Sequence, residues 1–181
     1  MRTLLVAILL TAIPVILFNC SPRNDELLEI QEYTGPIGEV SNAIIYYSDS
    51  AKVKMRMKTP KLLNFGNGDS EYPEGLFLEF FDNDGTLTSS LEADYCFYTK
   101  KDDLYKATGN VIIKNLEKGD RLDTEELFWN KRKEEVFTDK FVRIEQDGDL
   151  LLGDGLKAKQ DFSSYNILNP KGKLSLSNNE N

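Results

Sequence analysis

Histidine is absent from all 181 residues of the chain, and cysteine occurs only twice, as Cys20 and Cys96. Without histidine, the chain can form neither a Ser-His-Asp nor a Cys-His catalytic group, nor the usual histidine-bearing zinc sites. If Cys20 is acylated, Cys96 has no partner for an intramolecular disulfide, and the aligned leucine described below makes it a small core residue. We therefore expect no enzyme activity, no catalytic or metal site and no cofactor.

Motifs that would bind a ligand are also scarce. The stretch Asp82–Thr86 ("DNDGT") starts like a calcium loop but lacks the closing glutamate, so a hairpin turn explains it better. The stretch Gly153–Leu156 ("GDGL") is too short for a phosphate-binding loop, and no helix follows it. Pairs such as Glu125–Glu126 point to opposite faces of a strand, which makes them solvated surface.

The charge is acidic, with 30 Asp and Glu against 22 Lys and Arg, a net charge of −8 and a pI near 4.7. This balance argues against nucleic acid or an acidic bilayer surface as a partner. It is equally the ordinary surface of a soluble domain.

The one long apolar run, Thr3–Phe18, follows Arg2 at the N-terminus. At a rise of about 1.5 Å per residue, these 16 residues would reach roughly 24 Å as a helix, less than the ~30 Å of a bilayer core. The run is therefore typical of a signal segment. The next residues, Leu17–Cys20, resemble the lipobox of bacterial lipoproteins, although Asn19 departs from it.

We interpret residues 1–19 as a lipoprotein signal peptide or membrane anchor, with Cys20 as the lipidation site. An uncleaved anchor and plain secretion remain alternatives. Residues 20–38 are polar and suit a tether, residues 39–176 would form the domain, and 177–181 a disordered tail. About 160 residues suffice for one domain of ordinary size.

The rest of the chain shows no sustained helical period. Short runs of β-branched and aromatic residues alternate with turn signals such as "FDNDGT", "NLEKGD" and "EQDGD". This spacing predicts an all-β protein.

A repeat supports stacked hairpins. The segment from Leu91, "LEADYCFYTKKDDLYKATGNVIIKN", aligns without a gap on the segment from Leu122, "LDTEELFWNKRKEEVFTDKFVRIEQ", at an offset of 31 residues. The alignment places Cys96 on Leu127. Self-similar strand pairs predict stacked antiparallel hairpins that share one elongated core and leave two open edges.

The alternation within the strands predicts which side chains point inward. In "GLFLEFFD", the residues Leu76, Leu78 and Phe80 share one face, and Glu79 marks the opposite face as the outer one. In both repeats the alternation slips by one residue, between Ala93 and Cys96 and between Thr124 and Leu127. A bulge at the same place of each unit would explain the slip.

A tethered, histidine-free chain of stacked hairpins resembles the LptC family, the periplasmic bitopic component of lipopolysaccharide export. The likeness spans roughly residues 40–175. It rests on the turn glycine, L-x-A-D, G-x-V, G-x-G-L and Tyr-x-Ile motifs, which here are Gly85, Leu91–Asp94, Gly109–Val111, Gly153–Leu156 and Tyr165–Ile167. The chain departs from the better-known members at its anchor, because these keep one spanning helix whereas Cys20 indicates acylation.

The resemblance implies a twisted β-jellyroll with a V-shaped groove open along one side. It implies a membrane-anchored protein on the periplasmic side of the inner membrane in a Gram-negative envelope. There the groove would accept lipopolysaccharide from an inner-membrane ABC transporter and pass it to an LptA-like carrier docked edge to edge. The physics agrees, because acyl chains in water need an apolar wall and open edges accept a neighbouring strand.

The inward-facing residues would line this lipid-binding groove: Leu76, Leu78, Phe80, Leu91, Ala93, Tyr98, Val111, Ile113, Leu127, Trp129, Val142 and Ile144. For the partner edges we expect residues 161–175, with Tyr165 and Ile167, to face the next carrier and residues 44–57 to face the transporter. Each groove residue is equally explained as the core of a plain sandwich.

Two other functions remain open from the sequence. The same hairpins could build a non-carrier lipoprotein that acts as an envelope scaffold or adhesion module. An enzyme that cleaves surface glycans through a pair of aspartates is the weaker alternative.

Overall fold

The computed structural model describes residues 33–175, and all regular structure within them is β. The prediction of an all-β protein is therefore confirmed. In chain order the strands are β1 (Pro36–Asp49), β2 (Lys52–Phe65), β3 (Ser70–Tyr72), β4 (Leu76–Phe81), β5 (Leu87–Ala93), β6 (Tyr95–Thr99), β7 (Leu104–Asn115), β8 (Arg121–Asn130), β9 (Glu135–Gln146), β10 (Asp149–Lys159) and β11 (Tyr165–Ser175).

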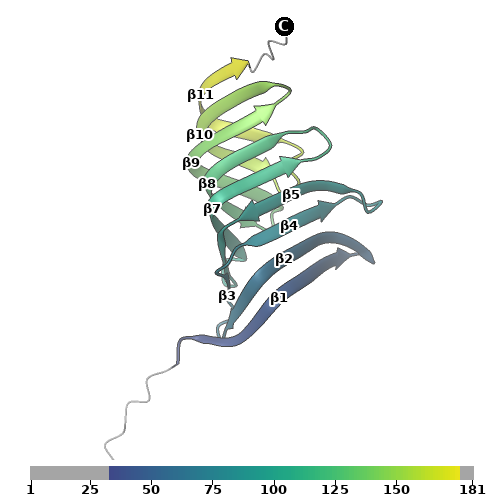
Figure 1. Cartoon of the computed structure of the whole chain (residues 1–181), viewed down its shortest axis with the longest axis vertical. Coiled ribbons are helices and arrows are strands. Elements are labelled where there is room, and N and C mark those ends of the chain that lie inside the picture. The colour runs from purple at the N-terminus through teal and green to yellow at the C-terminus, as the bar shows by residue number, and fades with distance from the viewer. Residues whose placement is uncertain (1–32, 176–181) are drawn as a thin grey trace, which may run out of the picture. The chain divides into compact units, whose positions relative to one another are not determined.

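The eleven strands pair antiparallel in one sheet, stacked as in Figure 1 from β1 and β2 at one end to β11 at the other. The two sequence repeats are successive hairpins of this stack. The first repeat forms the end of β5, then β6 and β7, and the second forms β8 and β9. The edge strands of the stack are β1, which pairs with β2, and β11, which pairs with β10.

The sheet folds on itself into two layers because the long strands run through both. The first part of β2 pairs with β4 and its last residues pair with β3. Likewise β7 pairs first with β6 and then with β5. We name the two halves the β3–β6 layer and the β4–β5 layer after the short strands that belong to one layer alone.

The line where the sheet turns from one layer into the other is marked by register shifts and glycine. Between β5 and β6, Asp94 interrupts the strand, and its backbone N–H donates to the Gly109 carbonyl at 3.0 Å. Gly109 has φ +76 and Asn110 φ +44, both in the left-handed region. The β8–β9 pairing shifts between Thr124 and Phe128, where the sequence predicted a bulge. The predicted irregularity is thus the corner of the fold.

The core lies between the inner faces of the two layers. Leu78, Leu91 and Ile113 are cross-strand neighbours in the β4–β5 layer and are all buried. Leu78 and Leu91 face Cys96 and Leu127 of the other layer, which are 1% exposed. The inward alternation of the sequence is confirmed, and Cys96 is the small core residue that its alignment with Leu127 predicted.

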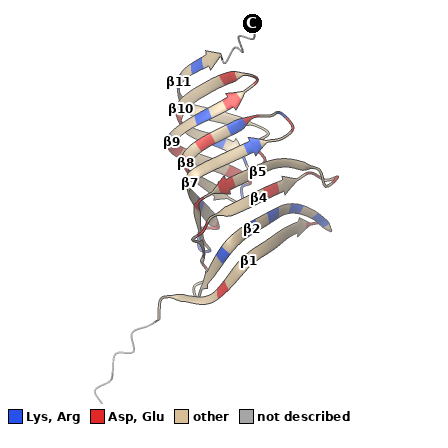
Figure 2. Ribbon diagram, viewed as in Figure 1, with Lys and Arg blue, Asp and Glu red and all other residues tan. Residues whose placement is uncertain are grey.

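The outer face carries the charges, as Figure 2 shows for the basic residues of β2. Glu79, predicted to point outward, does so, yet only 8% of its side chain is exposed, because Arg56 and Lys58 cover it. The Arg56 guanidinium contacts both carboxylate oxygens, at 2.6 and 2.7 Å. This bidentate pair, rather than burial among apolar residues, explains the position of a buried charge on the outer face.

The signal or anchor segment, Cys20, most of the tether and residues 177–181 lie outside the described residues. Residues 33–175 contain no apolar helix of membrane-spanning length.

Candidate functional site

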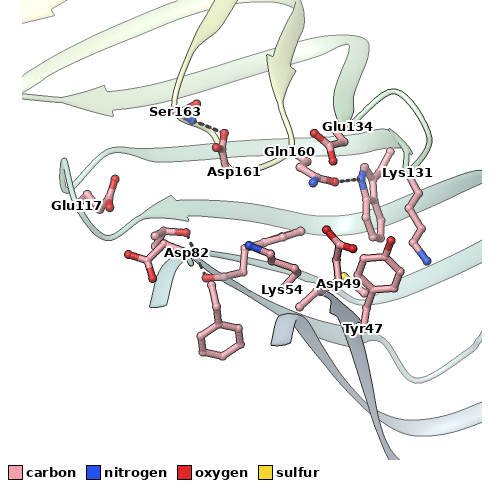
Figure 3. Close-up of a pocket in the computed structure, with 15 residues that line it drawn as sticks. Tyr47, Asp49, Lys54, Asp82, Glu117, Lys131, Glu134, Gln160, Asp161 and Ser163 are labelled. Carbon is pink, nitrogen blue, oxygen red and sulfur yellow. Dashed lines mark hydrogen bonds between the residues drawn. The ribbon is translucent and has the colours of Figure 1, made fainter. Parts of the chain in front are cut away.

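The two layers meet along the corner, and their turns lie along the opposite side of the sheet. There a cavity of about 490 Å³ opens between the turns of the two layers, within the 300–1,000 Å³ usual for ligand sites. The β4–β5 layer contributes the turn regions around Asp49, Asp82 and Glu117, and the other layer those around Glu134 and Gln160. We call this opening the mouth (Figure 3).

The floor of the mouth is apolar. Met55, Phe80 and Trp129 line it and are only 4–6% exposed. The rings of Phe80 and Trp129 meet edge to face with centroids 5.9 Å apart, and Trp129 stacks on Tyr105 at 4.7 Å. Phe80 belongs to β4 and Trp129 to β8, so the floor joins the two layers.

The rim of the mouth is charged. In Figure 3, Asp49 and Lys54 lie opposite Glu134 and Gln160. Lys131 reaches across from the β8–β9 turn and places its ammonium 4.0 Å from the centre of the Tyr47 ring, a cation–π contact between the layers. The mouth therefore combines an apolar floor with a polar rim.

The loop of residues 160–164, between β10 and β11, forms one side of the mouth. Gln160 accepts a hydrogen bond from the Trp129 indole N–H at 3.0 Å. Phe162 is fully buried, with its ring stacked on Tyr165 at 4.9 Å. Its carbonyl accepts from the Asn115 amide of the opposite layer at 3.2 Å. The loop thus bridges the layers, and Phe162 fills the space between them.

Next to Phe162, at the edge of the β4–β5 layer, lies a row of polar side chains that are buried or partly buried, and the Phe162 carbonyl contacts this row at Asn115. Ser89 pairs with Asn115, and the Asn115 backbone N–H donates to the Asp120 carbonyl. The Gln146 amide lies 3.5 Å from an Asp120 carboxylate oxygen. Burial raises the pKa of Asp120 above its ordinary value, with Asp147 adding to the effect. We call Ser89, Asn115, Asp120 and Gln146 the polar row.

The structure brings the twelve predicted groove residues together on the inner faces of the two layers. Tyr98 is partly buried and the other eleven are buried. Only Phe80 and Trp129 of the twelve line the mouth. The remainder forms the packed interior behind it: Leu76, Leu78, Leu91, Ala93, Tyr98, Val111, Ile113, Leu127, Val142 and Ile144.

The residues predicted for the docking edge have a different position from the one that their strand suggests. Tyr165 and Ile167 lie on the edge strand β11, yet both pack against the core, and the Tyr165 hydroxyl donates to Gln146 at 2.7 Å. The exposed apolar residues of β11 are Leu168 and Leu174, at 53% and 56% exposure. These two therefore probe docking without disturbing the core.

The sequence analysis placed residues 161–164 at the docking edge and missed that this loop bridges the two layers with Phe162 buried. It also missed the polar row. The loop sequence "QDFSS" has the composition of a polar turn. Its one aromatic residue, Phe162, is not part of an alternating apolar pattern that would predict burial. The signal that could have found it is a large aromatic side chain in a turn otherwise made of polar residues.

Within residues 33–175, no group of three or more Cys, Asp and Glu side chains could hold a metal ion. Desolvation raises the pKa of the buried Cys96 thiol to about 12, which keeps it protonated and unreactive.

The chain matches a known protein family. The family model described as "LptC: Lipopolysaccharide-assembly, LptC-related" covers residues 4–170. The match includes the whole of β1 to β10 and reaches Pro170 in β11. A comparison with curated proteins finds no match.

Proposed function

The chain belongs to the LptC-related family of lipopolysaccharide-assembly proteins, and we propose that it carries lipopolysaccharide between its two β-layers as one step of a relay. The family is a non-enzymatic transport component of the Gram-negative envelope, with lipopolysaccharide and the export machinery as its partners. The relay assigns this chain the step between an inner-membrane ABC transporter and a periplasmic LptA-like carrier.

The observation that carries the proposal is the mouth, with its apolar floor of Phe80 and Trp129 beneath a charged rim. Each CH₂ group removed from water contributes about 0.8 kcal/mol, so acyl chains favour the floor and the interior behind it. The sugar headgroup stays outside the cavity, at a polar rim that carries Lys54 and Lys131 together with five acidic side chains.

The cavity alone is too small for a lipid with several acyl chains. The gap among Leu78, Leu91 and Trp129 behind it measures only about 10 Å³. Loading therefore requires the two layers to separate, so that side chains now packed against each other contact acyl chains instead. The twelve groove residues become the wall of the opened trough.

The edges of the sheet provide the docking surfaces of the relay. On β1 only Ala43 is buried, while Ile37 and Ile44 are 69% and 57% exposed. On β11, Leu168 and Leu174 are exposed in the same way. An edge strand with exposed apolar side chains accepts a neighbouring strand by β-augmentation. We assign β1 to the transporter and β11 to the next carrier.

Photocrosslinking in living cells tests the carrier function. A photoreactive phenylalanine at Phe80, on the floor of the mouth, should label lipopolysaccharide. The matched control is Phe77, on the same strand but on the outer face beside Lys58. Labelling from position 80 and silence from position 77 support the carrier, whereas silence from both would refute it.

For the anchor we propose acylation of Cys20, which would hold the protein on the periplasmic side of the inner membrane. Two acyl chains give stable attachment, while one chain alone binds only marginally. The lipobox-like residues Leu17–Cys20 support this assignment.

An envelope scaffold is the second candidate, and the tightly filled interior favours it. A scaffold needs a rigid, closed core and two docking edges, and the roughly 10 Å³ gap behind the mouth fits that need. A chain that docks through β1 and β11 but never labels lipid would be such a scaffold.

A further inference from the structure

The polar row contains two side-chain atoms without a hydrogen-bond partner in the described part of the chain. These are the Ser89 hydroxyl oxygen and one carboxylate oxygen of Asp120, in residues only 0% and 1% exposed. Most buried polar groups in folded proteins are hydrogen-bonded, so each exception needs an explanation. Here both exceptions fall in one row on the inner face of one layer.

The loop of residues 160–164 contacts the row at Asn115 and lies across the mouth from it. The two hydrogen bonds that tie the loop to the β7–β8 turn are the Asn115 amide on the Phe162 carbonyl and the Lys118 ammonium on the Ser163 carbonyl, at 3.2 and 2.7 Å. Phe162 adopts φ +55, a left-handed conformation that a bulky residue rarely takes. The loop is thus strained and has two contacts across the mouth.

We propose that the polar row is a binding site for uncharged hydroxyl and amide groups of the carried lipid, reached when the loop of residues 160–164 withdraws Phe162. The proposal rests on the carrier function and specifies which part of the lipid the protein reads. Acyl chains that bear a hydroxyl group and are joined to a sugar through an amide offer these groups where the chain meets the head.

The charges of the polar row determine whether it binds uncharged groups or phosphate. With the loop withdrawn, Ser89 and Asn115 can both donate hydrogen bonds, and Asp120 accepts. The Asp120 carboxylate repels a phosphate at this depth, whereas a hydroxyl or amide N–H can donate to it. The row therefore excludes phosphate groups, which stay in solvent outside the mouth.

The raised pKa of Asp120 supports this assignment. Burial without a full set of partners destabilises its charged form, and a donating hydroxyl group would replace part of the lost hydration.

Two probes that differ by one hydroxyl group test the site. They are N-(3-hydroxytetradecanoyl)glucosamine and N-tetradecanoylglucosamine, titrated into the full chain in phospholipid nanodiscs with empty nanodiscs as the blank. We expect the hydroxylated probe to bind about tenfold more tightly, the value of one good hydrogen bond.

In the variants Ser89→Ala and Asp120→Asn, the ratio of the affinities for the two probes should fall from about ten to close to one. The control is Ser90→Ala, on the next residue of β5, which faces the outer side. It should keep the tenfold preference. A preference that survives in both row variants, or that is absent from the unsubstituted chain, would overturn the polar-row site.

A variant of the loop tests its role separately. Replacing Lys118 by alanine removes one of its two contacts, which should raise the affinity for the hydroxylated probe about two- to fivefold by favouring the open loop. Lys101→Ala, in the exposed β6–β7 turn, is the control. Unchanged affinity in Lys118→Ala would contradict the role of the loop.

The outcomes separate this site from the carrier function. If position 80 crosslinks to lipopolysaccharide but the two probes bind equally, the polar-row site is refuted and the carrier function is still supported. If the hydroxylated probe binds more tightly but lipopolysaccharide is never crosslinked, the carrier function for lipopolysaccharide is refuted and the polar-row site is still supported.

Discussion

Phe80 of β4 and Trp129 of β8 meet edge to face across the two layers, with ring centroids 5.9 Å apart. Trp129 is the only tryptophan of the chain, and it is 4% exposed at the floor of the mouth. The sole indole fluorophore therefore sits where the proposed acyl chains enter.

The first prediction uses this fluorophore. Lipopolysaccharide or a lipid carrying brominated acyl chains should quench the Trp129 emission, because bromine then comes within contact distance of the indole. The measurement is steady-state fluorescence of the full chain, with the unbrominated lipid as the control. Binding shown by an independent method without any quenching would place the lipid elsewhere.

The corner glycine Gly75 is expected to be essential for stability. It has φ +82, and a Cβ atom added there would lie 2.5 Å from the Ala93 carbonyl oxygen, which is backbone and cannot move aside. Gly75→Ala should lower the free energy of unfolding by about 3 kcal/mol, from backbone strain and the clash together. Urea unfolding measures this change.

The matched control for that substitution is Gly85→Ala. Gly85 also has a left-handed φ, +84, but nothing lies within 4 Å of an added Cβ. Its loss should be only about 1 kcal/mol. Equal losses at both positions would show that the crowded corner does not matter.

Glu79 should give the stability a pH dependence. The hydrogen bonds from Arg56, and then those from Lys58, lower the pKa of Glu79 below its ordinary 4.5, despite the opposing effect of burial. A lowered folded-state pKa stabilises the fold above the unfolded value, and this contribution is lost as the pH falls through 4.5 toward the folded value. Glu79→Gln should therefore be less stable than the unsubstituted chain at pH 7.

The comparison across pH checks the cause. Urea unfolding at pH 7 and at pH 3 should show a gap between the two proteins that narrows at the lower pH, where the carboxylate takes up a proton. A gap that stays constant would assign the loss to packing instead of charge.

A charge introduced on the β11 edge should leave folding intact but weaken docking. Because Leu168 is 53% exposed, Leu168→Glu should leave the unfolding curve nearly unchanged and weaken pull-down of the next carrier. Leu116→Glu, in the β7–β8 turn at 49% exposure, is the control that should keep pull-down intact. The corresponding change at Ile167 would disturb the core and could not separate the two effects.

The anchor is tested by labelling with a fatty acid. Cys20→Ser should abolish incorporation of labelled palmitate, while Cys96→Ser, which changes only a buried thiol, should not. Intact mass spectrometry of the mature chain reads the modification directly. Unlabelled unsubstituted chain would favour the uncleaved anchor or secretion.

Much of this fold follows from local patterns in the sequence. Alternation in "LFLEFFD" predicts the buried face with Leu76, Leu78 and Phe80, and the aligned repeats predict the shared interior of β5 to β9. These predictions succeed because a strand with one buried face leaves a period of two in its sequence.

The parts that escaped prediction depend on contacts between distant segments. Phe162 is buried by the layer that holds Asn115, 47 residues away, and nothing in "QDFSS" encodes that meeting. The inward position of Tyr165 depends likewise on Gln146 of β9. The slip near Asp94 was visible as a bulge, but only the structure shows that it turns the sheet into two layers.

The continuity of the long strands through both layers determines how the interior can widen. Because β7, β8, β9 and β10 each span the corner, separating the turns does not require breaking the ladder of hydrogen bonds between neighbouring strands. Gly109, Asn110 and Gly155 have left-handed φ at this corner, so torsion angles there would take up the bending. For the proposed carrier, the energy of loading would then come from separating apolar surfaces and from torsional bending, and the secondary structure would stay intact as cargo enters and leaves.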